Sequence, residues 1–399
     1  MDHMYLRSTT KLGIVLNLVL NQAFVVVACA PQTPITSKDQ AERQGVRLVK
    51  DIRLLKDNAG RPEWSPDGRY ITYHARSDDD NYDIYIMTSD GTRNRCLTCE
   101  HPDLPKGHIG QASWHPSGDW IVFQAEKNQH AHTKLGVKLR GLAAPGIGFH
   151  NDVWIMSRDG TKVRQLTNLT TKQRVLDRTP TSAILQPHFS HGGTLLSWSE
   201  RVADGGRWGK WVIRIAAFQI NRGVPQLGKV RTLRPGVNKG YYESNDFMPG
   251  DKGLLISGNL EPNQDEFGID VYYLDLAHGR TTRLTHSLDA FDECPHPSPD
   301  GSRIAYLSTS GFEPRGKRTK GAWAWWNWAK GEFWLMNADG SNKQRLTFFN
   351  EPGYPEYDGR RVIPAYVAWH PNGKQLLLGI TVEVKKRRLR DQMYLVRLQ

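Results

Sequence analysis

The stretches PEWSPDGRYITYHA, Pro62–Ala75, and DIYIMTSDGTRNRCLT, Asp83–Thr98, form one unit that the chain repeats. An apolar run stops at a Ser-Pro-Asp-Gly turn, two further apolar runs follow, and an Asp-Gly turn leads to a basic-Leu-Thr ending. The same order returns in CPHPSPDGSRIAYLST, Cys294–Thr309, and EFWLMNADGSNKQRLT, Glu332–Thr347. Self-similarity of this kind marks an array of one supersecondary unit.

Six copies of the first turn can be aligned. They are WSPDG at Trp64, WHPSG at Trp114, FSHGG at Phe189, FMPGDKG at Phe247, PSPDG at Pro297 and WHPNG at Trp369. The third apolar run recurs at Asp83, Asp152, Trp211, Asp270, Glu332 and Asp391. The runs have the aromatic and β-branched composition of strands, and Asp, Asn and Gly suit tight turns. Four short strands per unit, repeated six times, predict an all-β protein, a six-bladed β-propeller with four-stranded antiparallel blades.

The two ends of the repeat region complement each other. The last unit has three strands, Tyr366–His370, Gln375–Val382 and Gln392–Leu398, and no fourth. Upstream of the first unit, Val46–Asp57 has strand composition and no repeat of its own. We expect this N-terminal strand to complete the last blade, because closure of the ring removes open strand edges.

The Ser-Pro-Asp-Gly and Asn-Ala-Asp-Gly turns and the Arg-Leu-Thr ending resemble those of the TolB-like propeller family, whose PD40 repeats are related to WD40 units. The resemblance extends from about Gln44 to Gln399. It implies a six-bladed propeller. The family includes binding proteins, peptidase-associated propellers and a few lyases, so the resemblance does not define an activity.

The first 29 residues have the features of a secretory leader. Arg7 and Lys11 precede an apolar stretch, Leu12–Ala28, that ends in VVAC at Cys29. A basic start, a short apolar core and a small residue before the cut are typical of a signal peptide. The residues VVAC resemble a lipobox, which would make Cys29 the site of lipidation. An ordinary cleaved signal and an uncleaved anchor are the alternatives.

These features predict three segments: a lipoprotein-type signal peptide at 1–29, a polar tether at 30–44 and the propeller at 45–399. The expected location is outside the cytoplasm, in the periplasm or at the outer membrane, with the membrane reached through a lipid anchor.

The charge of the chain limits its partners. It has 53 Lys and Arg residues against 41 Asp and Glu residues, a formal net charge of +12. This suits an anionic envelope surface, an anionic glycan or an acidic partner. An exported protein rarely meets nucleic acid, so we expect none, and we expect a monomer. No nucleophile elbow, phosphate-binding loop or dinucleotide fingerprint appears in the sequence.

The four cysteines give a weaker signal. Cys96 and Cys99 form a CxxC pair at the end of an expected fourth strand. In extended backbone alternate side chains point to opposite faces, which disfavours a disulfide, and two thiols alone do not make a zinc site. Free and locally bridged cysteines both remain open. Cys294 is expected to be a small core residue.

Propeller topology sorts the loops onto two faces. Strands within a blade alternate in direction, so the turns between strands one and two and between strands three and four emerge together. The loops between strands two and three and the blade connections emerge on the other side, and they are long and irregular. Binding residues concentrate in such loops, so we call this side the loop-rich face.

A tryptophan-rich segment lies on the expected loop-rich face, in GAWAWWNWAKG, Gly321–Gly331, after RGKRTK. Its candidate binding residues are Trp323, Trp325, Trp326, Trp328, Arg318 and Lys320. Indole rings stack on sugars or lie at membrane interfaces, and Arg and Lys bind phosphate or carboxylate. The alternative is that most of the rings are buried against blades five and six.

A second candidate set consists of carboxylates that close the second strands: Glu126, Glu200, Glu261 and Glu383. Matched positions in a ring would place them around one axis, where they could hold a cation or a basic ligand. The alternative is that each pairs with a neighbouring base such as Lys127, Arg201 or Lys385.

The starts of the inner strands supply a third set, which lines the expected channel. Its members are His108, Gln111, Gln186, His188, Glu243, Asp246, Glu293 and His296. Clustered His, Gln and acidic groups suit a divalent metal, with His188, His296 and Glu293 as weak candidates. Oligogalacturonate lyases resemble this fold and use a His/Gln metal site in the channel.

Together these features favour an exported, non-catalytic binding scaffold without a cofactor. Its loop-rich face and channel would bind an envelope protein, a peptide or a glycan. The alternative is a metal-dependent lyase acting on an acidic polysaccharide, with a divalent cation in the channel.

Overall fold

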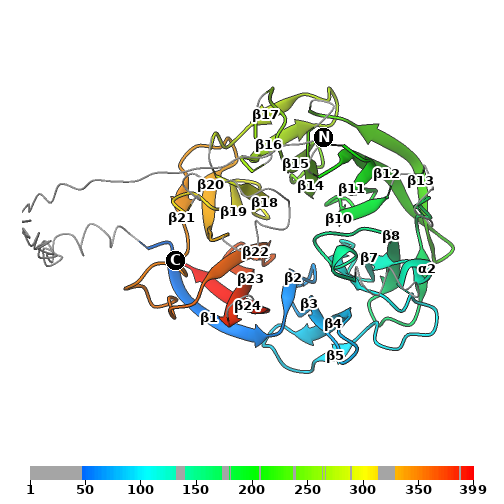
Figure 1. The fold of residues 1–399 in the computed structure, drawn as a ribbon, viewed down its shortest axis with the longest axis horizontal. Helices are drawn as coiled ribbons and strands as arrows, with labels where there is room; N and C mark the ends of the chain where they lie inside the picture. Colours follow the sequence, from blue (N-terminus) through cyan, green and yellow to red (C-terminus); the bar gives the residue numbers. More distant parts are fainter. Residues whose placement is uncertain are drawn as a thin grey trace, which may run out of the picture. The chain divides into compact units, whose positions relative to one another are not determined.

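A computed structural model describes residues 47–131, 140–172, 179, 181–205, 208–236, 240–262, 264–265, 267–287, 290–312, 329–385 and 388–399. Residues 47–399 form one compact unit that contains six four-stranded sheets. Figure 1 shows the sheets arranged in a ring, with the first strand of each blade toward the centre and the last toward the outside. The six-bladed all-β propeller predicted from the repeats is therefore confirmed. None of the described helices is long and apolar enough to cross a bilayer.

Each blade is an antiparallel sheet of consecutive strands, except the last. Blade 1 consists of β2 (Gly60–Trp64), β3 (Tyr70–Arg76), β4 (Tyr82–Thr88) and β5 (Arg95–Cys96), and blade 2 of β6 (Ile109–Trp114), β7 (Trp120–Glu126), β8 (Asn151–Ser157) and β9 (Val163–Gln165). Blade 3 consists of β10 (Ala183–Phe189), β11 (Leu195–Ala203), β12 (Lys210–Asn221) and β13 (Val224–Leu233), and blade 4 of β14 (Tyr242–Phe247), β15 (Gly253–Gly258), β16 (Asp270–Asp275) and β17 (Thr281–Arg283). Blade 5 consists of β18 (Asp292–Pro297), β19 (Arg303–Ser308), β20 (Glu332–Asn337) and β21 (Gln344–Arg345). Blade 6 consists of β22 (Val362–Trp369), β23 (Gln375–Lys385), β24 (Arg388–Leu398) and β1 (Val49–Asp57), and a short helix α2 (Asn128–Ala131) and a 3-10 turn η1 (Arg140–Leu142) lie between β7 and β8.

The N-terminal strand closes the ring. β1 pairs antiparallel with β24, from Val49 opposite Leu398 to Asp57 opposite Gln392. The prediction that Val46–Asp57 supplies the missing strand of the last blade is confirmed. The first and last strands of the propeller therefore lie side by side in one sheet, at the lower left of the ring in Figure 1.

The repeated turn is held by its own side chains. In blade 5, Ser298 Oγ donates to Asp300 at 2.6 Å and accepts a hydrogen bond from the backbone N–H of Arg303 at 3.0 Å. The hydrogen bond from Ser298 and those from Ser302 lower the pKa of Asp300 to about 2. The Asp and Ser side chains thus provide hydrogen bonds that the backbone of a tight turn cannot make with itself.

The basic-Leu-Thr ending also has a structural cause. In blade 4, Thr285 Oγ1 donates to Asp270 at 2.9 Å and accepts from the N–H of Val271 at 3.0 Å. The same contact, which we call the Asp–Thr latch, joins Asp83 to Thr98, Asp152 to Thr167, and Glu332 to Thr347. The latch fixes the end of one blade to the start of its third strand, which explains why the two motifs recur together.

The aromatic residue before the first turn packs between blades. Trp114 of blade 2 donates from Nε1 to Thr72 of blade 1 at 3.0 Å, and Trp369 of blade 6 donates to the carbonyl of His296 in blade 5 at 3.1 Å. Both indoles are buried. The recurring aromatic is therefore an interface residue between neighbouring sheets.

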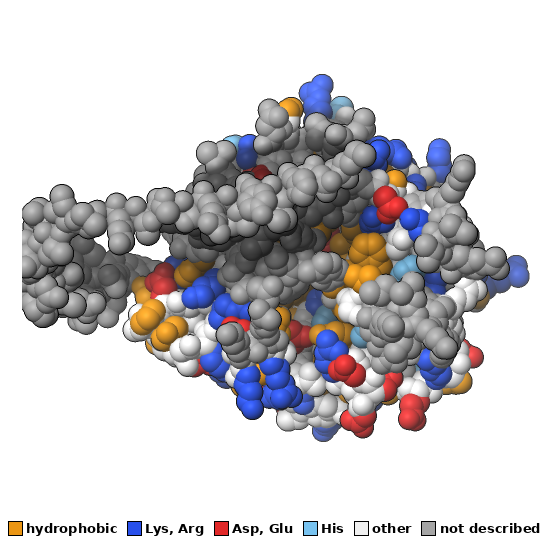
Figure 2. Space-filling model, in the orientation of Figure 1, with side chains coloured by type: hydrophobic (Ala, Val, Ile, Leu, Met, Phe, Trp, Pro, Cys, Tyr) orange, Lys and Arg blue, Asp and Glu red, His pale blue; other side chains and the backbone are white. Residues whose placement is uncertain are grey.

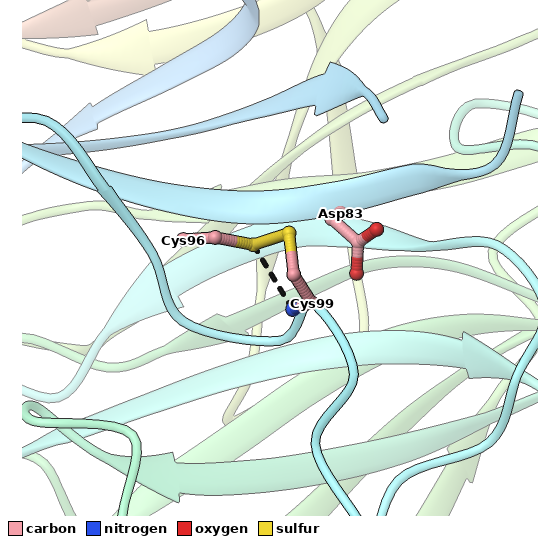
Figure 3. Close-up of side chains that lie close together, drawn as sticks. All are labelled: Asp83, Cys96 and Cys99. Carbon is pink, nitrogen blue, oxygen red and sulfur yellow. Dashed lines mark hydrogen bonds between the residues drawn. A yellow bond between two sulfur atoms is a disulfide. The ribbon is translucent and has the colours of Figure 1, made fainter. Parts of the chain in front are cut away.

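Cys96 and Cys99 form a disulfide (Figure 3). The expectation that extended backbone disfavours this bond fails because β5 ends at Cys96, and the chain bends before Cys99. The Cα atoms are 5.7 Å apart, within the range that a disulfide can join. Cys294 is buried and free, as expected of a small core residue.

Candidate functional site

All six inner strands carry an irregularity two to four residues before the position that precedes the turn, which is aromatic in five blades and Pro297 in blade 5. The pairing register shifts there in β2, β6, β10, β14, β18 and β22. Four residues at these bulges, Arg61, Gln111, Gln186 and Cys294, have positive φ angles between 44° and 54°. A bulge redirects a side chain, and six of them occur in the strands that surround the axis of the ring.

Side chains from different blades meet at this axis. We define the axis cluster as Arg61, Glu63, Gln111, Ser113, Gln186, His188, Glu243, Asp246, Glu293, Cys294, His296 and Tyr366. Arg61 of blade 1 donates to Gln186 of blade 3, which lies 3.6 Å from the sulfur of Cys294 in blade 5. Gln111 of blade 2 accepts from the backbone N–H of Gln186 at 2.8 Å. The structure thus brings together groups that are up to about three hundred residues apart in the chain.

Tyr366 is the central hydroxyl of the cluster. It donates to Glu63 Oε2 at 2.9 Å, and His188 Nε2 lies 3.0 Å from the same oxygen. Because the hydroxyl proton is directed to Glu63, His188 donates from Nε2 and accepts from Ser113 Oγ, 3.2 Å away, at Nδ1. Burial lowers the pKa of His188 to about 3. His188 is therefore neutral, and its two ring nitrogens are both in use.

Asp246 and His296 form a second pair. His296 Nδ1 lies 3.1 Å from Asp246 Oδ2. Burial favours the protonated acid, but the hydrogen bond from His296 and the neighbouring imidazoles prevail and lower the pKa of Asp246. His296 Nε2 is buried and has no partner among the described residues. A neutral His296 that donates to Asp246 keeps a lone pair on that nitrogen.

Glu243 and Glu293 form a coupled acidic pair. The two carboxyl groups are hydrogen-bonded to each other, and Tyr241 donates to Glu243 at 3.0 Å. Burial and the neighbouring Glu243 raise the pKa of Glu293 well above its ordinary value, and burial also raises the pKa of Glu243. Two carboxyl groups in contact share a proton, because two negative charges at this short range would repel each other.

Glu63 is a third acid with an altered affinity for protons. The residue is only partly buried by surface area. Burial, with a smaller contribution from Asp246, raises the pKa of Glu63 to about 8. Arg61 attracts Glu63, Glu243 and Glu293 alike, and its guanidinium lies 4.2 Å from the Tyr366 ring centre. Acidic groups therefore outnumber the basic side chain at the axis.

Figure 2 shows hydrophobic, acidic, basic and histidine side chains close together near the middle of this face. Glu63, Asp246 and Glu293 are only partly buried by surface area, in contrast to Gln111, Gln186 and Glu243. These acidic residues of blades 1, 4 and 5 therefore keep some accessible surface.

The predicted ring of second-strand carboxylates divides into separate local contacts. Glu200 pairs with Arg214 at 2.7 Å, and Glu383 pairs with Arg361 at 3.0 Å. Glu126 accepts from the backbone N–H of His108 at 3.1 Å, and Glu261 is exposed.

Two of the three bases proposed as partners of these carboxylates, Lys127 and Arg201, bind other acids. Lys127 contacts Asp152, and Arg201 pairs with Asp204 at 2.8 Å. Neighbours along a strand point to opposite faces, so an acid reaches a base on an adjacent strand instead. His108 accepts at Nδ1 from the N–H of Tyr82 at 3.1 Å, apart from the bonds of the axis cluster.

The tryptophan-rich candidates Trp323, Trp325, Trp326, Trp328, Arg318 and Lys320 lie outside the described residues, as does Cys29. Among described residues, three metal-ligand atoms come within 4.8 Å of one another only in the group Asp83, Cys96 and Cys99 (Figure 3). Its two sulfurs are joined in the disulfide. His188, Glu293 and His296 do not form such a group.

Sequence reasoning missed Arg61, Glu63, Ser113, Tyr241 and Tyr366. A signal for four of them was available, because Arg61 and Tyr366 stand three residues before the aligned aromatic, and Glu63 and Ser113 stand one before it. Gln186 and His188 occupy the same two positions in blade 3. Extending the alignment of the six turns upstream would have identified the axis residues.

No protein-family model matches the chain. Among solved structures, the putative TolB from Agrobacterium tumefaciens is similar over 87% of this chain and 93% of that chain, with 16% identity and a TM-score of 0.50. TolB from Acinetobacter baumannii aligns over 90% of this chain and 68% of that chain, with 14% identity and a TM-score of 0.46. An oligogalacturonate lyase in complex with manganese aligns over 87% of this chain and 93% of that chain, with 12% identity and a TM-score of 0.46. The resemblance to TolB-like propellers is thus confirmed for the fold.

Proposed function

We propose that the protein is an exported binding scaffold whose loop-rich face and central channel hold an envelope protein, a peptide or a glycan. The observation that carries this proposal is the axis cluster. Its acidic residues Glu63, Asp246 and Glu293 are only partly buried, and Arg61 acts on both Glu63 and Glu293. Protonated carboxyl groups donate hydrogen bonds and ionised ones accept them, so the cluster suits a polar group of a ligand that enters from the loop-rich face.

The side chains best suited to catalysis are held in inactive forms. His188 has a pKa of about 3, and burial raises the pKa of Tyr366 and of Cys294 well above their ordinary values. A general base or nucleophile works best with a pKa near the working pH. Recognition by fixed hydrogen bonds fits this cluster better than proton transfer by these groups.

Export is supported by two independent features. The leader with its lipobox-like VVAC predicts secretion and lipidation at Cys29. The Cys96–Cys99 disulfide belongs to an oxidising compartment. We propose a periplasmic or outer-membrane-anchored protein. Metabolic labelling with a radioactive fatty acid tests the anchor, because a Cys29→Ala variant should lose the label.

Capture of partners from envelope extracts tests the scaffold. We expect a specific partner that is lost by Trp325→Ala or Trp328→Ala, which belong to the proposed binding loop, and weakened by His188→Ala in the axis cluster. Thr282→Val on the exposed side of β17 should retain it. Loss of capture in none of the variants, or equal loss in all of them, would contradict binding through the loop-rich face.

The unpartnered Nε2 of His296 favours one further candidate, a metal-dependent lyase for acidic polysaccharides. A carboxylate that orients a histidine, as Asp246 does, is a common outer-shell arrangement in metal sites. The described residues do not bring a third ligand to His188 and His296, so we assign no step to a metal. Unsaturated products from a uronate polymer incubated with the protein and Mn²⁺ would establish this activity over the scaffold.

A further inference from the structure

Blade 2 contains a cavity that the axis cluster does not use. It has a volume of about 330 Å³ and lies between β8, β9 and the connections that enter and leave the blade. These connections belong to the loop-rich face. No residue of the axis cluster lines the cavity, so its ligand is independent of the one proposed for the channel.

An indole forms its apolar wall. Trp154 stands on β8 directly opposite Gln165 on β9, and both line the cavity. The Trp154 side chain is only partly buried, so its ring offers surface to the cavity. A flat aromatic surface suits a ligand that presents C–H groups.

Amide groups line the remaining walls. Asn128 accepts from the N–H of Lys106 at 2.8 Å, which leaves its amino group as a donor. Gln165 donates to Asp152 at 3.0 Å, which leaves its carbonyl oxygen as an acceptor. Asn168 accepts from Lys127 at 3.4 Å, which leaves its amino group as a second donor. A wall that offers both donors and an acceptor matches hydroxyl groups, each of which both donates and accepts.

The charges of the cavity disfavour sugars that carry a carboxylate. Lys127 is in contact with Asp152, so these two charges cancel. Asp103 also lines the cavity and forms no ion pair with a described residue. The remaining charge is negative, although the whole chain is basic. A carboxylate ligand would be repelled, and an ammonium group would be attracted.

We propose that this cavity binds a single pyranose unit that lacks a carboxylate, either a neutral hexose or an amino sugar. The Trp154 ring stacks on the sugar, and the amides of Asn128, Gln165 and Asn168 bind the hydroxyls. The volume lies at the small end of the roughly 300–1,000 Å³ range of ligand pockets, which suits one sugar unit better than a peptide segment.

Titration of the full chain with glucose, glucosamine and glucuronate, followed by saturation-transfer NMR, tests the proposal. We expect glucosamine to bind at least as well as glucose, and glucuronate to bind about tenfold more weakly or not at all. Asp103→Asn should weaken glucosamine alone. Glucuronate binding as strongly as glucose, or binding of none of the three, would overturn the proposal.

Substitutions of residues that line the cavity test whether the sugar binds there. Trp154→Ala should weaken glucose about tenfold. Trp334→Ala is the matched control, because Trp334 holds the same position on β20 of blade 5 and also has a buried, unpartnered Nε1. Asn168→Ala tests the same wall without removing an aromatic, in case Trp154→Ala fails to fold. Equal weakening by Trp334→Ala, or full binding by Asn168→Ala and Trp154→Ala, would contradict the assignment.

Discussion

Tyr366 of the last blade donates a hydrogen bond to Glu63 of the first blade at 2.9 Å. The two blades that meet at the closure are therefore joined at the axis of the ring as well as at its outer edge, where β1 pairs with β24. The inner contact also reaches His188 in blade 3, on the other side of the channel. Closure of the ring and the order of the axis cluster thus depend on the same hydroxyl group.

Replacement of Tyr366 by Phe should destabilise the propeller by about 1–3 kcal/mol, because Glu63 and His188 lose their shared partner in a buried site. Equilibrium unfolding in urea measures the loss. Tyr394→Phe is the control, since the Tyr394 hydroxyl makes no hydrogen bond to a described residue of the same sheet or its neighbours. Equal losses of unfolding free energy in the two variants would show that the hydrogen bonds of the Tyr366 hydroxyl do not stabilise the propeller.

Glu63 should make stability depend on pH. Its pKa is about 8 in the folded protein against an ordinary value of 4.5, so the folded state binds more protons between these values. The stabilisation by protonated Glu63 is complete below about pH 4.5 and is lost as the pH rises through about 8.

Glu63→Gln cannot ionise, so its stability relative to the unaltered protein should increase with pH across this window, by up to about 1.4 kcal/mol per pH unit. Unfolding free energies between about pH 5 and 9 test this. Glu261→Gln, an exposed site, should show no such trend. Parallel curves for Glu63→Gln and the unaltered protein would mean that Glu63 titrates normally.

The Asp–Thr latch should contribute to stability in each blade that has it. Thr285→Val keeps the shape of the side chain but removes the bond to Asp270 and the acceptor for Val271. We expect a loss of about 1–3 kcal/mol in urea unfolding. Thr282→Val on the exposed side of β17 should change stability by less than about 0.5 kcal/mol. A neutral Thr285→Val would leave the repeated Arg-Leu-Thr motif without this explanation.

The fold was accessible from the sequence because each blade repeats the same local solution. Ser298 with Asp300 and Thr285 with Asp270 are short-range contacts, so the motifs that make them are visible as letters at fixed spacing. Val46–Asp57 has the composition of a strand but belongs to no repeat, and this indicated how the ring closes. The pairing of β1 with β24 confirmed it.

The axis cluster was less accessible because its contacts join residues with no fixed spacing. His188, Gln186 and Glu293 were selected by chemical type, but their partners Tyr366 and Arg61 come from the far ends of the repeat region. For the second-strand carboxylates, the sequence pattern predicted a shared site that the structure does not form. Their matched positions suggested a shared site, whereas Glu200 and Glu383 pair locally with Arg214 and Arg361.

Covalent closure of the ring gives a direct test of the outer seam. Leu54 on β1 is exposed and lies opposite Tyr394 on β24. Opposed residues of antiparallel strands are about 4.5–5.5 Å apart between Cα atoms, so cysteines placed at Leu54 and Tyr394 should form a disulfide. The bond closes a very long loop and should raise stability by about 6 kcal/mol in the chain-entropy description, measured as the difference between oxidised and reduced protein. Cysteines at Leu54 and Val396 are the control, because Val396 is buried and opposite Ile52 instead. A disulfide that forms equally well in both variants, or that leaves unfolding unchanged, would mean that β1 does not hold this register in solution.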